Sequence, residues 1–329
     1  MRRIISTSIV VLVLLSQAGC LFADDDPNLS IYDIQYTTDL AGDSPYKDQI
    51  VDCLGGIVTH KFRGGYPKLT LYDPSRPDCW GGIQVKDWTS PPDMFDSVQI
   101  GDWVSFENVL VEEDDSRGNT ILKYYSGNSP EFTVVSTGNP MPTPLRVDLG
   151  EITSPREGPP YDWYVEDHRA EKYEHMWLRV EKITVTRKDL GKADDNYVLQ
   201  SFEYPSDPNR SCWAADYMNV DAIGDYHPYV ELGSRFCAVE GILEQYTKTT
   251  SGWDYYQLLT ITTDDFIVGQ TADFDDDCDV DLLDFGLFAA HWLEDGCKDP
   301  NWCGGADLNQ NSYVDPPDME KFSENWLSR

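Results

Sequence analysis

The chain has 329 residues, of which 58 are Asp or Glu and 25 are Lys or Arg, so its formal net charge is −33. Hydrophobic residues make up 40% and aromatic residues 12%, which is enough to fill real cores and excludes a chain that is disordered throughout. The acidity argues against sequence-independent nucleic-acid binding, because phosphates would be repelled, and it favours calcium, which prefers oxygen ligands.

The first residues predict export from the cytoplasm. Two arginines precede an apolar run, residues 4–15, that is too short to span a bilayer but is typical of a signal peptide, here residues 1–23. Three cleavage points are open: after Ala18, after Ala23 or before Cys20. The last would make Cys20 the lipidated residue of a bacterial lipoprotein. We therefore expect a secreted or lipid-anchored extracellular protein of a bacterium, without a transmembrane segment.

The middle of the chain, residues 27–270, has a composition typical of short strands and turns. Tyr, Trp, Val, Ile and Thr are broken there by Gly, Pro, Asp and Asn. A proline-rich stretch, residues 139–144, marks a boundary between two halves, which we place at 27–140 and 145–270. Five or six strands in about a hundred residues favour a small Greek-key barrel of the OB type in each half.

The two halves share a strand pattern. The predicted strands are 50–59, 105–111, 120–124 and 132–135 in the first half and 177–186, 237–243, 255–259 and 266–268 in the second. The first half resembles the OB-like domains of secreted bacterial nucleases at residues 31–38, 44–46, 55–59 and 80–85. This resemblance implies the fold and no activity, because the chain has no room for the nuclease catalytic domain.

The cysteines favour an oxidising compartment and one disulfide in each half. The predicted pairs are Cys53 with Cys79 and Cys212 with Cys237. Cys278 is then left over, and it either pairs across the C-terminal part or stays buried.

No constellation in the sequence identifies an active site, so catalysis is left uncertain and a non-catalytic protein is favoured. The five histidines lack metal-ligand spacing, and the carboxylates are too many to select an acid–base pair. Ten aromatic residues either form stacking platforms or, as we favour, fill the barrel cores. They are Trp80, Trp88, Trp103, Tyr124, Tyr125, Trp213, Tyr217, Trp253, Tyr255 and Tyr256. With this net charge, the ligand left for such platforms is neutral carbohydrate or protein.

Residues 271–329 contain a duplicated unit in which every matched pair is offset by 34 residues. Side-chain oxygens recur at loop positions 1, 3, 5 and 12, position 7 offers a backbone carbonyl, and position 8 is Val280 or Val314, expected to pack beneath the loop. Apolar residues then follow at helical spacing. The predicted ligands of two calcium ions are Asp273, Asp275, Asp277, Asp279 and Asp284, then Asp307, Asn309, Asn311, Tyr313 and Asp318.

This tandem loop–helix unit resembles a type I dockerin. The resemblance implies a small α-helical, calcium-folded module that docks onto a cohesin-like or cell-surface partner. Position 6, usually Gly in the family, is Cys278 in one loop and Ser312 in the other. Cys297 and Cys303 bracket the segment between the two units and are predicted to form a disulfide.

The expected fold is therefore mainly β, with two tandem OB-like Greek-key barrels followed by a small α-helical dockerin-like module. Two functions remain open. The first is a secreted, non-catalytic adaptor anchored by its calcium-folded module. The second is an extracellular hydrolase acting on the O-glycosyl bonds of polysaccharide, because dockerins are usually appended to such enzymes. Nucleic acid is not expected as a partner.

Overall fold

The structure of the chain, a computed structural model, describes residues 28–39, 42–63, 66–114, 118–152, 168–188, 196–216, 230–248 and 253–326. It is mainly β, with closed barrels and few helices, in agreement with the predicted class. The predicted signal peptide and Cys20 lie outside the described residues. In the part of the chain that is described, no helix has the length and apolarity needed to cross a membrane.

The first barrel is a six-stranded sheet that closes on itself because β1 pairs with β4 as well as with β2. Its strands are β1 (Ile50–Phe62), β2 (Lys68–Tyr72), β3 (Gly82–Asp87), β4 (Trp103–Glu113), β5 (Thr120–Tyr124) and β6 (Glu131–Ser136). Their order is β1-β2-β3-β5-β4-β6, and β3 runs parallel to β5 whereas the other neighbours are antiparallel. This closed arrangement is consistent with an OB-like fold.

Alternate side chains of the strands fill the first barrel, because successive residues of a strand face opposite sides. Val104 and Phe106 of β4, for example, are buried in its core. Two short helices, α1 (Ile31–Gln35) and α2 (Asp93–Ser97), add buried apolar side chains. Strand β1 approaches β4 closely at Gly55 (φ 67°), where a Cβ would lie 1.6 Å from the carbonyl oxygen of Val104. Only glycine fits there.

The second barrel is a seven-stranded sheet closed by pairing of β11 with β8. Its strands are β7 (Leu145–Arg146), β8 (Trp177–Lys188), β9 (Asn196–Ser201), β10 (Ser211–Ala215), β11 (Arg235–Lys248), β12 (Trp253–Leu259) and β13 (Phe266–Ile267). The closed ring β8-β9-β10-β12-β11 has the same order as the ring β1-β2-β3-β5-β4, with the parallel pair, β10 and β12, at the same place. The strands predicted in both halves overlap the observed ones.

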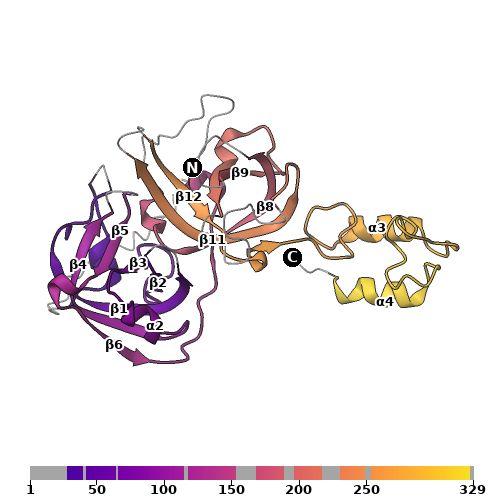
Figure 1. Cartoon of the computed structure of the whole chain (residues 1–329). Helices are drawn as coiled ribbons and strands as arrows, with labels where there is room; N and C mark the ends of the chain where they lie inside the picture. Colours follow the sequence, from indigo (N-terminus) through magenta and orange to yellow (C-terminus); the bar gives the residue numbers. More distant parts are fainter. Residues whose placement is uncertain are drawn as a thin grey trace, which may run out of the picture.

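The two barrels lie side by side (Figure 1), and hydrogen bonds join them. The backbone N–H of Trp80 donates to the carbonyl of Lys172 (2.6 Å), and the N–H of Thr120 donates to the carboxylate of Glu174 (3.1 Å). Burial raises the pKa of Glu171, beside this contact, to about 8. Burial and the charge of Glu171 raise the pKa of Glu174 well above its usual value. The barrels are therefore joined around buried carboxyl groups.

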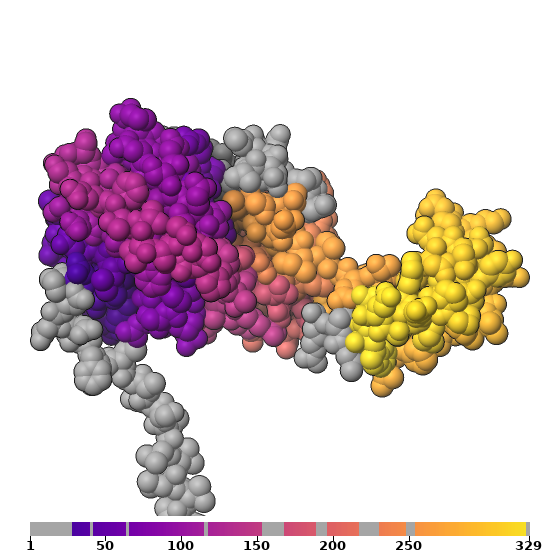
Figure 2. Space-filling model, turned by 90° about the horizontal axis from the view of Figure 1, so that it is seen from below, coloured from indigo at the N-terminus to yellow at the C-terminus, as the bar shows by residue number. Residues whose placement is uncertain are grey.

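The C-terminal segment, residues 271–326, forms a separate lobe that projects from the second barrel (Figures 1 and 2). Its helices are α3 (Leu282–Ala290) and α4 (Pro316–Glu324). Val280 and Val314 are 1% and 0% exposed, so the prediction that they pack beneath the loops is confirmed. They share a small core with Phe288 and Phe322.

The disulfides follow the predicted pattern only in part. Cys297 and Cys303 are bonded, as predicted. The predicted bond between Cys212 and Cys237 is wrong, because Cys237 is bonded to Cys278. Strand β10, which carries Cys212, is not a neighbour of β11, and the Cys212 side chain lies in the barrel core. Cys237 instead joins β11 to the C-terminal segment.

The predicted bond between Cys53 and Cys79 is also wrong. Cys53 is 1% exposed and belongs to the core of the first barrel, whereas Cys79 lies in the connection between β2 and β3. Burial raises the pKa of the Cys53 thiol to about 12. Cys53 and Cys212 therefore act as small apolar core residues.

Candidate functional site

An exposed stack of rings with one ammonium group lies at one end of the first barrel. Tyr66 and Trp88 stack with their ring centroids 3.9 Å apart and an angle of 12° between the ring planes. The Nζ atom of Lys123 lies 4.3 Å from the ring centroid of Trp88 and 5.5 Å from that of Tyr125. We call Tyr66, Trp88, Lys123 and Tyr125 the aromatic column. Tyr66 is 50% exposed and Trp88 38%, so ring surface is open to a ligand.

The strand register brings the column together from distant segments. Tyr66 precedes β2, Trp88 follows β3 and Tyr125 follows β5. Strand β2 begins opposite the end of β3, and β5 runs parallel to β3, so the three residues meet at the same barrel end. The backbone N–H of Trp88 donates to the carbonyl of Tyr124 (2.8 Å), which ties the ends of β3 and β5 together.

Lys123 of the column and Arg63, which follows β1, are each paired with a carboxylate. Lys123 Nζ lies 2.8 Å from an Oε atom of Glu112, and Arg63 pairs with Asp96. The guanidinium of Arg63 also lies 4.8 Å from the ring centroid of Phe95. The column therefore offers ring faces more than free positive charge.

The aromatic residues singled out in the sequence lie in different surroundings. Trp88 and Tyr125 lie in the column, whereas Trp213 and Tyr256 are at most 1% exposed, as expected for core residues. Tyr217 lies outside the described residues. Sequence reasoning missed Tyr66, because strand β2, which sets its position, was not predicted and no local signal marks this residue.

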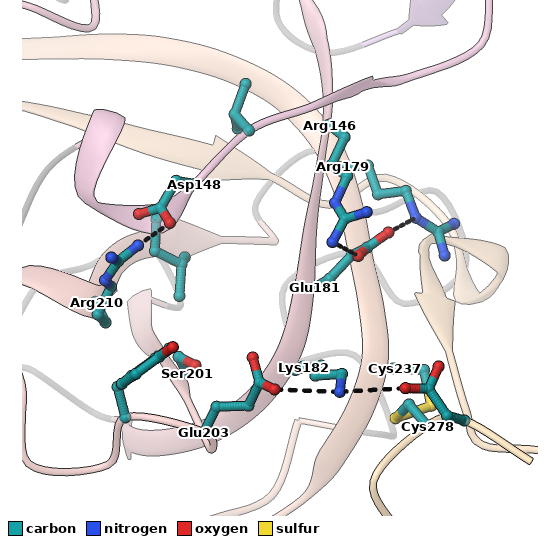
Figure 3. A pocket seen from close by; sticks show the side chains of 14 residues that line it. Arg146, Asp148, Arg179, Glu181, Lys182, Ser201, Glu203, Arg210, Cys237 and Cys278 are labelled. Atoms are coloured by element: carbon teal, nitrogen blue, oxygen red, sulfur yellow. Dashed lines mark hydrogen bonds and ion pairs between the residues drawn. A yellow bond between two sulfur atoms is a disulfide. The ribbon is translucent and has the colours of Figure 1, made fainter. Parts of the chain in front are cut away.

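A cavity of about 540 Å³ lies between the second barrel and the C-terminal segment (Figure 3). Ion pairs line its walls: Arg210 with Asp148, Arg146 with Glu181 (2.6 Å), Arg179 with Glu181 (3.1 Å), and Lys182 with Glu203 (3.2 Å) and Asp279 (3.6 Å). Each of these cations faces a carboxylate, so the walls carry no marked excess of either charge. The cavity is therefore a polar space where the second barrel meets the C-terminal segment.

The first acidic loop, residues 273–284, brings three of its predicted ligands together. One carboxylate oxygen from each of Asp273, Asp275 and Asp277 lies within 4.8 Å of the others. The Oδ1 atom of Asp275 is buried without a hydrogen-bond partner. Burial, and then the charges of Asp277 and Asp284, raise the pKa of Asp275. Converging oxygens that repel one another fit a hard divalent cation.

The other predicted ligands of the first loop play different parts. Asp284 is 0% exposed, and its carboxylate accepts the backbone N–H of Phe274 (2.6 Å), which holds the loop against the start of α3. The side chain of Asp279 lies 3.6 Å from Lys182 on β8. Only the backbone carbonyl of Asp279 was expected as a ligand, and its side chain is thus available to the barrel.

The second loop, residues 307–318, is wound in the same way. The Asp307 carboxylate accepts the N–H of Asn311 (3.0 Å), and the Oδ1 atom of Asn309 accepts the same N–H (2.9 Å). Asp318 is 0% exposed, like its counterpart in the first loop. The Tyr313 side chain is 55% exposed, so its part in a metal site is limited to the carbonyl named above.

Comparison with known proteins gives likenesses of fold. No protein-family model matches the sequence, and the search of curated proteins finds no match. A murine DNA-binding protein bound to double-stranded DNA is similar with 9% identity and a TM-score of 0.32, over 64% of this chain and 93% of that one. The HINa domain of Ifi202 in complex with 20-bp double-stranded DNA is similar with 10% identity and a TM-score of 0.31, over 64% and 92%. A Replication Protein A heterotrimer bound to single-stranded DNA is similar with 13% identity and a TM-score of 0.23, over 54% and 41%.

These likenesses correct two expectations from the sequence. The expected functions, an adaptor docked to a cohesin-like or cell-surface partner and a polysaccharide hydrolase, are contradicted, because the three structures named above are DNA complexes and none is a dockerin-type adaptor or a hydrolase. The expectation that nucleic acid is not a partner, and that carbohydrate or protein is, is contradicted by the same structures. At TM-scores of 0.32 and below, however, they assign no function to this chain.

Proposed function

We propose that the chain binds nucleic acid through the aromatic column and prefers unpaired bases. The observation that carries the proposal is the half-exposed ring of Tyr66 stacked on Trp88. The column stands beside the ends of β2 and β3 and the β1–β2 loop, which is the region where OB folds bind oligonucleotides. A base that extends such a stack contributes about 1–3 kcal/mol. A duplex keeps its bases stacked inside, so it offers the column no free base.

Because the net charge is −33, we expect binding to depend on stacking more than on phosphate contacts. Proteins that neutralise phosphates lose affinity as salt rises, with a slope of about −0.7 per contact for single strands. Because Lys123 is shared with Glu112, we expect about one phosphate contact and a logarithmic salt slope of about −1 or shallower. Stacking then supplies most of the affinity.

Fluorescence anisotropy with a labelled oligothymidylate of about 15 nucleotides tests the proposal. The wild type should bind it and bind a duplex of the same length more weakly. Trp88→Ala and Tyr66→Ala should each weaken binding about 5- to 150-fold, which corresponds to the loss of one stacking contact. Tyr204→Ala is the matched control, because Tyr204 is a 53% exposed tyrosine on the second barrel.

Two results would count against this function. One is absence of binding at low salt by a folded protein. The other is equal affinity of the wild type and both column variants, which would show that any binding occurs elsewhere on the protein. A steep loss of affinity with salt would show that phosphate contacts, and not the rings, hold the strand.

We further propose that the C-terminal segment folds around two calcium ions, one in each loop. The converging oxygens of Asp273, Asp275 and Asp277 support this assignment, together with the repeated winding of the second loop. Residues 271–329 contain 15 acidic and three basic residues, so their carboxylates repel one another without a cation. Calcium should therefore stabilise the segment. Calorimetric titration that detects no calcium binding, with circular dichroism unchanged by excess chelator, would refute it.

The finer organisation is also a proposal. We infer that residues 27–140 and 145–270 are tandem OB-like barrels, which the repeated strand order supports. We infer that residues 271–329 are a loop–helix module of the type I dockerin kind, and that the chain is exported to the bacterial cell surface or beyond. Mass spectrometry of the mature N-terminus would distinguish a free protein from one lipidated at Cys20.

A further inference from the structure

The two loops differ at position 6, where the first has Cys278 and the second has Ser312. Both residues have a left-handed backbone, with φ of 75° and 80°. In both loops the backbone N–H at this position donates to the carboxylate of position 1, from Cys278 to Asp273 (2.9 Å) and from Ser312 to Asp307 (2.8 Å). The winding of each loop around its first carboxylate therefore sets the direction of the position-6 side chain.

In the first loop that side chain is bonded to the second barrel. Cys278 forms a disulfide with Cys237 of β11, and the next residue, Asp279, lies 3.6 Å from Lys182 of β8. Figure 3 shows Cys237, Cys278 and Lys182 together at the polar cavity. Asp273, whose carboxylate is the first predicted ligand, holds the backbone of the same cysteine. One short segment thus carries both the predicted metal site and the covalent link.

We propose that calcium binding in the first loop and the Cys237–Cys278 disulfide are coupled, so that each favours the other. The inference rests on the calcium sites proposed above. Without a cation, the carboxylates of Asp273, Asp275 and Asp277 repel one another, and the unwound loop carries Cys278 away from Cys237. With calcium, the wound loop presents the Cys278 sulfur to Cys237. Because the disulfide in turn restricts the unwound states, calcium binding orders less chain when the bond is closed.

The coupling must be reciprocal, because both effects belong to one thermodynamic cycle. A factor of about tenfold is expected, within the range typical of coupled sites. The redox step is ordinary thiol–disulfide exchange. Dithiothreitol attacks the bond and leaves as its cyclic disulfide, while Cys237 and Cys278 gain two electrons and two protons as free thiols.

The first experiment compares calcium affinity with and without the bond. Calorimetric titration of the oxidised protein and of the double variant Cys237→Ser/Cys278→Ser should show one site weakened about tenfold and the other unchanged. The second loop is the internal control, and its site is identified by its loss of affinity in Asn309→Ala. The second loop has Ser312 at position 6, so its affinity should not depend on the disulfide.

The second experiment measures the reverse effect on the full, unmutated chain, so it stands even if the double variant misfolds. At equilibrium with mixtures of reduced and oxidised dithiothreitol, read out by alkylation and mass spectrometry, the Cys237–Cys278 bond should be about tenfold more favoured in calcium than in chelator. In Asp275→Asn, which removes one ligand of the first loop, this preference should shrink. Any effect of calcium on Cys297–Cys303 should be the same in both proteins.

The outcomes separate the two proposals. If calcium binds with the same affinity with and without the disulfide, and does not shift the thiol–disulfide equilibrium, the coupling is refuted while the calcium sites stand. If neither loop binds calcium, the calcium sites and the coupling fail together. A tenfold effect in both directions at the first loop supports the coupling.

Discussion

Replacing Glu171 by glutamine should remove a pH-dependent weakness at the contact between the barrels. Glu171 is 5% exposed, and the hydroxyl of Tyr256 donates a hydrogen bond to its carboxylate. Burial is the main cause that raises its pKa from 4.5 to about 8, and the charge of Glu113 adds to the rise. Glutamine keeps an oxygen for Tyr256 and never ionises, so Glu171→Gln isolates the effect of the charge.

The magnitude follows from the difference between the folded and unfolded pKa. Below pH 4.5 the carboxyl is protonated in both states, and its full contribution to stability is present. Between pH 4.5 and about 8 only the unfolded chain ionises, so the free energy of unfolding falls as the pH rises. A pKa difference of about 3.5 (8 − 4.5), at about 1.4 kcal/mol for each unit, sets an upper bound of about 5 kcal/mol.

Urea unfolding followed by tryptophan fluorescence at about pH 5 and about pH 8 measures this effect. The difference in unfolding free energy between Glu171→Gln and the wild type should grow in favour of the variant as the pH rises. Glu151→Gln is the control for the exchange of a carboxyl group for an amide, because the Glu151 side chain is 48% exposed. If the Glu171→Gln difference does not change with pH, the carboxyl is not held neutral by burial and the reasoning is wrong.

Three further predictions concern packing. Phe288→Ala empties a fully buried site in the C-terminal core and should lower the free energy of unfolding by about 3–5 kcal/mol. The measurement is the melting temperature of that segment, which should fall, and an unchanged value would contradict the observed core. Gly55→Ala should cost about 3 kcal/mol or more in urea unfolding, because its Cβ would meet the carbonyl of Val104; a neutral result would mean that β1 shifts freely. Cys53 and Cys212 should resist iodoacetamide in the folded protein, because burial raises the pKa of both thiols; rapid alkylation seen by mass spectrometry would contradict their burial.

Strands and loops were predictable because their signals come from neighbouring residues. Alternation of apolar residues was enough to locate β4 and β11, since the period of a strand is two residues. The duplicated loops were predictable because each loop wraps a single short segment, so the burial of Val280 and Val314 followed from their position in the repeat. Cys297 and Cys303 are six residues apart, so their bond needed no knowledge of the fold.

The aromatic column and the buried carboxyl groups could not be read in the same way. Trp88 was singled out in the sequence and Tyr66 was not, and the two stack because the start of β2 lies beside the end of β3. Glu171 and Glu174 are two of 58 acidic residues, and nothing local marks them as buried. Their burial depends on the first barrel, which packs against the second barrel at the place where they lie.

The sequence by itself determined the mainly β class, the repeated strand pattern, the paired acidic loops and the short disulfide, since each depends on residues close together in the chain. Only the tertiary structure decided that Cys237 bonds to Cys278 and not to Cys212. That choice depends on which strands are neighbours and which way each side chain faces. Such contacts join residues far apart in the chain, and they form only when the barrels close and the C-terminal segment packs against the second one.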